Sequence, residues 1–148
     1  MSRLIFVNLP VTDVAKSTAF YEAVGAVRDP RFCDDSTSMM KFSDTIAVML
    51  LSRERFAQFT SKTIIDARTH VQTLIALSAD NRDGVDDTVA RATSAGGQPD
   101  PNPVQDYGFM YGRSFEDPDG HIIEVVWMDV EAALAAMSPA QQTEQVSA

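Results

Sequence analysis

The sequence is poor in cysteine and positive charge, and it has no long hydrophobic run. Cys33 is the only cysteine, so no intrachain disulfide and no thiolate metal site can form, and a reducing compartment is expected. The 12 basic and 21 acidic side chains give a formal net charge of -9, which disfavours nucleic acid and anionic membranes as partners. No apolar segment approaches the ~20 residues that a membrane-spanning helix needs. We therefore expect a soluble, cytoplasmic protein.

The 148 residues, 45% of them hydrophobic, fit one globular domain over residues 1–128. The order strand, helix, strands occurs twice, in modules of about residues 1–60 and 70–128. The expected strands are 4–9, 38–42, 46–51, 71–79, 109–115 and 121–128. The expected helices are capped by Thr12 or Asp13 and by Asp80 or Asp83, and a short helix is expected at 53–59. Such a duplicated unit has to pack against its twin to cover its sheet. Residues 129–148 are predicted to form a short Ala-rich helix and then a disordered tail.

Two motifs carry a family resemblance. Val11-Thr12-Asp13 is followed by Ser17, Phe20, Tyr21 and Gly25, and Phe115-Glu116-Asp117-Pro118-Asp119-Gly120-His121 leads to Glu124. These segments resemble the first strand and helix, and the closing hairpin, of vicinal oxygen chelate proteins of the glyoxalase, bleomycin-resistance and dioxygenase type. The resemblance implies an α+β fold in which two tandem βαβββ modules form a curved sheet cup, usually within a homodimer.

In metal-dependent relatives, four side chains in this cup bind a divalent ion. The resemblance places those positions at Phe6, Leu50, Leu74 and Glu124. Only Glu124 has an oxygen donor, whereas a catalytic metal needs about three protein ligands. His121 is three residues from Glu124, so the two side chains lie on opposite faces of the strand. We therefore predict no metal cofactor, and a divalent metal ion stays the alternative.

Glu124 is the candidate catalytic residue. Its expected neighbours on the same face, Ile122 and Val126, are apolar, and an apolar setting raises the pKa of a carboxylic acid toward that of a general base. Alternatively, Glu124 accepts a hydrogen bond from a ligand, or pairs with Arg113 or Tyr111 of the neighbouring strand.

A cluster of aromatic and cationic residues is the candidate rim of the cup. Tyr107, Tyr111 and Arg113 are predicted to bind a ligand above the floor formed by the apolar metal positions. Trp127 has the opposite parity to Glu124 and is interpreted as core. The Asp-Pro-Asp-Gly segment at 117–120 is interpreted as a structural turn. The strand methionines are assigned mainly to packing, with pocket walls as the alternative.

These observations favour a protein that binds a small hydrophobic or aromatic molecule in its cup. Two alternatives are a metal-independent isomerase or lyase with Glu124 as general base, and a divalent-metal enzyme of the glyoxalase or dioxygenase type. A purely structural dimerisation module is a further alternative. Whether the chain is an enzyme stays open, because a fold does not by itself determine a function.

Overall fold

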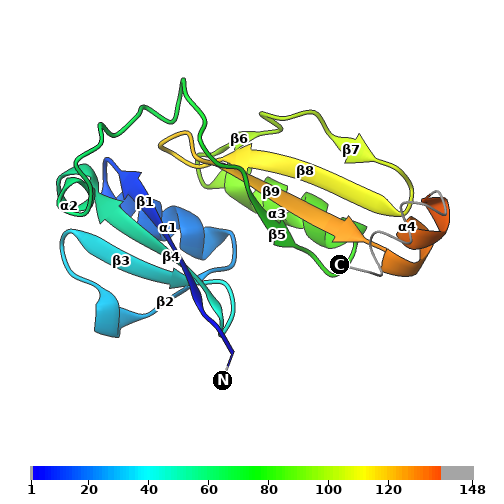
Figure 1. Ribbon diagram of the computed structural model, residues 1–148, viewed down its shortest axis with the longest axis horizontal. Helices are drawn as coiled ribbons and strands as arrows, with labels where there is room; N and C mark the ends of the chain where they lie inside the picture. Colours follow the sequence, from blue (N-terminus) through cyan, green and yellow to red (C-terminus); the bar gives the residue numbers. More distant parts are fainter. Residues whose placement is uncertain (1, 138–148) are drawn as a thin grey trace.

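Two sheets, each with a long helix on one face, make up the computed structural model, which describes residues 2–137 (Figure 1). The first module contains β1 (Ile5–Val11), α1 (Val14–Ala23), β2 (Val27–Arg28), the 3₁₀ turn η1 (Pro30–Phe32), β3 (Thr37–Lys41), β4 (Ile46–Ser52) and α2 (Arg53–Ala57). The second contains β5 (Ile75–Ser78), α3 (Arg82–Ser94), β6 (Gln98–Pro99), β7 (Gln105–Asp106), β8 (Met110–Glu116), β9 (Ile122–Met128) and α4 (Val130–Ala136). The disorder predicted for the tail concerns residues 138–148, outside the described part of the chain.

Both sheets have the same topology. Their strand orders are β1-β4-β3-β2 and β5-β9-β8-β6, and β7 also pairs with β8. In each sheet the first and last strands of the module run parallel and the other pairs run antiparallel. The α+β fold with two βαβββ modules is thus confirmed. Among residues 2–137, no helix combines the length and the apolar character needed to cross a bilayer.

Local sequence signals explain where the elements begin and end. Asp13 caps α1 by accepting a hydrogen bond from the backbone N–H of Lys16 at 3.0 Å, and Asn81, rather than Asp80 or Asp83, caps α3. The first strand was expected at 4–9, but β1 continues through Pro10 to Val11. A proline is tolerated there because β1 is an edge strand, with β4 as its single neighbour.

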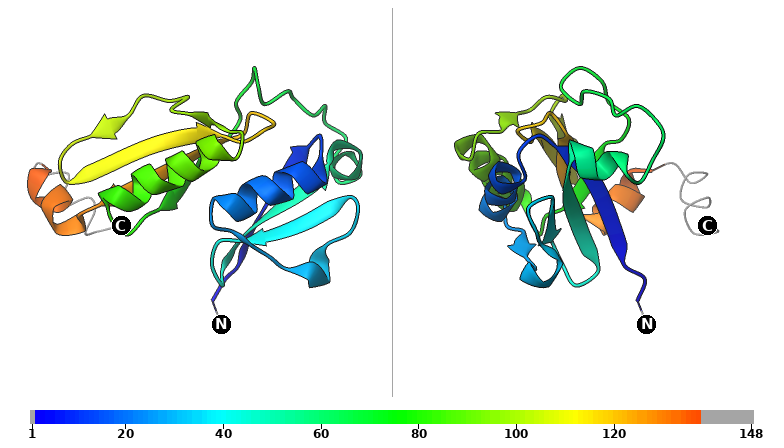
Figure 2. Two further views of the ribbon diagram at one scale, coloured as in Figure 1. Left: turned by 180° about the vertical axis from the view of Figure 1, so that it is seen from behind. Right: turned by 90° about the vertical axis from the view of Figure 1, so that its left-hand side faces the viewer.

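One hydrophobic core runs through both modules. Strand residues that face α1 and α3 form it together with the inner faces of the two helices, and the rings of Phe20 and Phe115 join the halves with centroids 5.9 Å apart. Seen from behind, both helices lie in front of their sheets (Figure 2). Over the described residues 2–137, no helix lies along the opposite face of either sheet, which is therefore its open face.

The turn at residues 117–120 links the modules. Asp117 accepts hydrogen bonds from the backbone N–H groups of Asp119 and His121, both at 2.9 Å, and from the hydroxyl of Tyr21 on α1 at 2.7 Å. Asp119 accepts a hydrogen bond from the backbone N–H of Thr12 at 3.0 Å. The two family motifs recognised in the sequence therefore bind each other.

Candidate functional site

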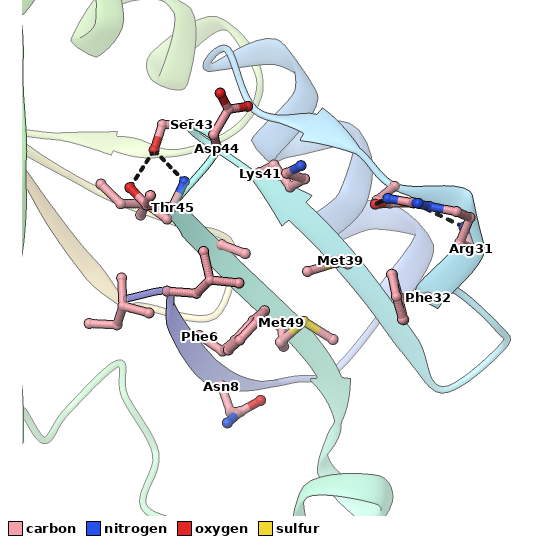
Figure 3. Close-up of a pocket in the computed structure, with 15 residues that line it drawn as sticks. Phe6, Asn8, Arg31, Phe32, Met39, Lys41, Ser43, Asp44, Thr45 and Met49 are labelled. Carbon is pink, nitrogen blue, oxygen red and sulfur yellow. Dashed lines mark hydrogen bonds and ion pairs between the residues drawn. The ribbon is translucent and has the colours of Figure 1, made fainter. Parts of the chain in front are cut away.

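The open face of the first sheet forms a pocket with a volume of about 460 Å³ (Figure 3). Two rows of side chains cross its floor: Lys41, Ala47 and Phe6 from β3, β4 and β1, and next to them Met39, Met49 and Asn8. Directly paired residues project from the same face of a sheet, so each row lies on one line across the three strands. The lining is mainly apolar.

The wall of the pocket comes from η1 and the β3–β4 turn. Phe32 stands across from Met49 and Phe6, with Arg31 at the rim (Figure 3). Arg31 is held by Asp29 in a pair of side-chain hydrogen bonds of 2.9 and 2.6 Å. These bonds lower the pKa of Asp29 to about 2 and raise the pKa of Arg31.

Leu50 is not part of this pocket. Its side chain is fully buried and packs with Val48 in the core beneath α1, because successive side chains of a strand point to opposite faces. Met49, one position earlier, lies on the open face opposite Asn8. The prediction that Leu50 lines the cup was therefore wrong by one residue.

The registers of the two sheets show which residues are equivalent. Met49 pairs with Asn8, two residues after Phe6, and Glu124 pairs with Ala76, two residues after Leu74. By this register Met49, and not Leu50, is the counterpart of Glu124, so the metal positions that the resemblance implies become Phe6, Met49, Leu74 and Glu124.

These four side chains do not fit the divalent ion that the resemblance implies. They offer one carboxylate and one thioether, and thioethers suit soft copper rather than hard or borderline divalent ions. The donor set is the same whether the two halves of a cup come from one chain or from two. Over residues 2–137, moreover, no group of three or more His, Cys, Asp and Glu side chains is placed to hold an ion.

Glu124 lies on the open face of the second sheet. It is half-buried, and its neighbours across the sheet are Ala76 on β5 and Ser114 on β8. Within the described part of the chain, its carboxylate has no hydrogen bond or ion pair with a side chain. It is therefore available to a molecule that approaches this face.

Tyr111 and Arg113 project from the other face of the same sheet. Arg113 binds Asp100 through two hydrogen bonds of 3.0 and 2.7 Å and Asp86 through one of 3.0 Å, while the Tyr111 hydroxyl donates to Asp86 at 2.6 Å. The Asp100 carboxylate raises the pKa of Arg113, and the bond to Asp86 raises the pKa of Tyr111. The pairing of Glu124 with either residue, one of the alternatives from the sequence, was wrong because the sheet separates them.

The remaining residues of the predicted cup lie away from the pocket. Tyr107 is exposed at the loop before β8, where its ring stacks on Phe109 with centroids 6.1 Å apart. Leu74 is exposed just before β5, and Trp127 packs against the core, as interpreted from the sequence. The structure therefore brings none of Leu74, Tyr107 and Glu124 together with Phe6 in this pocket within one chain.

The sequence did not single out Lys41, Phe32 or Asn8, and it treated Met39 and Met49 mainly as packing residues. The alternation of strand residues is the signal that would have found those on β3 and β4. Once Met40, Val48 and Leu50 are assigned to the core, their immediate neighbours on each strand must face the pocket. No local pattern marks Phe32, whose position depends on the conformation of η1.

Comparison with known proteins identifies the family. The sequence profile of the Glyoxalase/Bleomycin resistance protein/Dioxygenase superfamily matches residues 3–125. A search of curated proteins found no significant match. Among solved structures, a hypothetical protein from S. aureus is 24% identical with a TM-score of 0.71, and covers 86% of this chain and 94% of its own.

Two further solved structures are similar to this chain over most of their length. A glyoxalase/bleomycin resistance protein/dioxygenase family enzyme from Burkholderia phytofirmans is 21% identical with a TM-score of 0.70, over 86% of this chain and 99% of that one. An antibiotic binding protein from a Streptomyces species is 19% identical with a TM-score of 0.60, over 87% and 98%. Because the profile matches most of the sequence, the chain belongs to the glyoxalase/bleomycin resistance protein/dioxygenase superfamily.

Proposed function

We propose that this protein binds a small apolar or aromatic molecule on the open face of its first sheet, without a metal ion. The observation that carries the proposal is the pocket of about 460 Å³ in which Phe6 and Met49 occupy two of the family's metal positions. Aromatic rings and flexible thioethers provide a surface that adapts to flat organic molecules. The volume lies within the range of ordinary small-molecule sites.

The similarity to an antibiotic binding protein supports this proposal, since that protein shares the fold.

The pocket is open to solvent on one side, so a bound molecule needs a cover there. We propose that a homodimer provides it, with the second sheet of the partner closing over the pocket and bringing Leu74 and Glu124 to the ligand. Exposed apolar side chains on both modules, Phe6 at 49% and Leu74 at 47%, support this arrangement. We also propose a cytoplasmic location, on the basis of the single cysteine.

Calorimetric titration with uncharged naphthyl and anthracenyl alcohols tests the proposed function. We expect saturable binding to the wild type. In Met49→Asp the affinity should fall by about tenfold or more, because the new carboxylate loses solvation when an apolar molecule covers it. Val104→Asp is the matched control: Val104 is equally apolar and 48% exposed, but it does not line the pocket.

The same titration has outcomes that contradict the proposal. Absence of saturation with every compound would exclude this pocket as the binding site for such molecules, and so would an equal loss of affinity in the two variants.

A metal-independent lyase or isomerase with Glu124 as general base is the second candidate function, favoured by the unpaired carboxylate on the open face. Turnover of a carbonyl compound that is abolished in Glu124→Gln, with ligand binding retained, would assign the chain to that class.

A further inference from the structure

We infer that the ligand of this pocket is an organic anion: a flat apolar ring system with one carboxylate or acidic phenolic oxygen, which binds Lys41. This inference rests on the proposed function and narrows its ligand class. It starts from the charged residues of the pocket, which are Asp29, Arg31, Lys41 and Asp44.

Lys41 is the cation that the fold leaves available to a ligand. Arg31 is engaged by Asp29 in an ion pair of 2.6 Å. The Lys41 ammonium, in contrast, forms no hydrogen bond and no ion pair with any residue of the described range 2–137. The nearby carboxylate of Asp29 is already occupied by Arg31.

The position of Lys41 suits a ligand that is apolar at one end and anionic at the other. The residue is half-buried on the floor of the pocket, in one row with Ala47 and Phe6 and next to the row of Met39 and Met49. A ring that lies on the two methionines and Phe6 therefore has the ammonium at its edge (Figure 3). A hydrogen bond between two charged groups beside an apolar wall is stronger than one in open water.

Asp44 is the second acidic residue of the pocket, and it leaves Lys41 unpaired. Asp44 is exposed at the turn between β3 and β4, where water solvates its carboxylate. It does not form an ion pair with Lys41.

The distribution of charge along the chain agrees with this assignment. Residues 1–60 contain seven basic and seven acidic side chains, and residues 61–148 contain five basic and fourteen acidic ones. The net charge of -9 thus belongs to the second part of the chain, and the module with the pocket is neutral. The first sheet therefore suits an anion, and the acidic group of the ligand is expected to point to Lys41, away from the Glu124 that the proposed partner brings to the opposite wall of the cup.

The test compares three ligands that share one ring system, 2-naphthoate, 2-naphthylmethanol and 2-naphthylmethylammonium, by calorimetric titration of the full chain. We expect 2-naphthoate to bind most tightly and the ammonium compound most weakly. In Lys41→Met the affinity for 2-naphthoate should fall by about tenfold or more, while that for 2-naphthylmethanol changes by less than about twofold. Lys41→Arg should keep most of the affinity for 2-naphthoate, and added salt should weaken its binding to the wild type.

Lys16→Met is the matched control, because Lys16 is an exposed lysine on α1 outside the pocket, and it should bind all three ligands as the wild type does. Equal affinities for 2-naphthoate and 2-naphthylmethanol, or an affinity for 2-naphthoate that Lys41→Met leaves unchanged, would overturn the inference while the proposed function stands. If none of the three compounds binds at millimolar concentration, the inference and the proposed function are both contradicted. Melting curves of each variant show that the folded protein is compared in every case.

Discussion

Tyr21 is a fully buried phenol whose hydroxyl has one partner, the carboxylate of Asp117 in the other module. Burial and the nearby Asp117 charge raise the pKa of Tyr21 well above its ordinary value, so this hydroxyl stays protonated and keeps donating. Burial also raises the pKa of Asp117. This hydrogen bond of 2.7 Å therefore joins α1 to the turn at 117–120 in a place that water hardly reaches, beside a longer bond of 3.4 Å from the Ser17 hydroxyl to Asp119.

Removal of this hydroxyl is expected to destabilise the fold. Tyr21→Phe keeps the ring in the core but leaves a buried carboxylate oxygen without its donor, which costs about 1–3 kcal/mol of unfolding free energy. Urea denaturation measures the loss. Tyr107→Phe is the control, because its exposed hydroxyl donates to Gln105 on the surface, and it should change the stability by less than about 0.5 kcal/mol. Equal stabilities of the two variants would show that Tyr21 contributes through its ring alone.

At the scale of elements, the turn at 117–120 is a junction between β8, β9, α1 and the linker between the modules. Gly120 adopts a φ of +94°, and a Cβ atom there would lie 2.7 Å from the backbone of Arg68. The turn thus fits closely against the segment that connects β4 to β5.

Two glycine substitutions separate backbone strain from this contact. Gly108 also has a positive φ, +78°, but a Cβ atom there would meet nothing within 4 Å. We expect Gly108→Ala to cost about 1–2 kcal/mol, from the left-handed backbone conformation alone. Gly120→Ala should cost at least about 1 kcal/mol more, because the linker backbone has to move. Thermal unfolding of both variants checks the order, and a smaller loss for Gly120→Ala would contradict the close packing of linker and turn.

At the scale of the whole molecule, both sheets have an open face and a free edge that no other element of residues 2–137 covers along its length. β1 and β5 are edge strands, and exposed apolar residues lie on or beside them, including Ile5 at 54%, Val71 at 63% and Leu74 at 47%. Unpaired strand edges and apolar surface of this kind favour association with another chain.

We therefore expect the protein to sediment at micromolar concentration with twice the 16.2 kDa mass of the chain. Leu74→Lys should shift the equilibrium toward the monomer, since an ammonium would have to be buried where the apolar surfaces meet. Val104→Lys changes an equally exposed apolar residue in the loop between β6 and β7 and should leave the dimer intact. A monomeric wild type would refute the shared cup.

The sequence alone predicts most of the fold. The period-2 strands, the cap at Asp13 and the turn at 117–120 are local features, so the sequence predicts the two βαβββ modules, the family and the scarcity of metal-ligand side chains. Local rules do not say which of two adjacent residues faces the core, because both faces of β4 are apolar. That is why Leu50 was taken for a pocket residue in place of Met49.

Only the tertiary structure decided the site. The strand register placed Met49 and Lys41 in the pocket, and the sheet separated Tyr111 and Arg113 from Glu124, since neighbours across strands are far apart in the chain. The tertiary structure also showed that the two family motifs are joined by the hydrogen bond from Tyr21 to Asp117. Contacts of this kind depend on how elements pack, and packing is a property of the folded chain rather than of any segment in it.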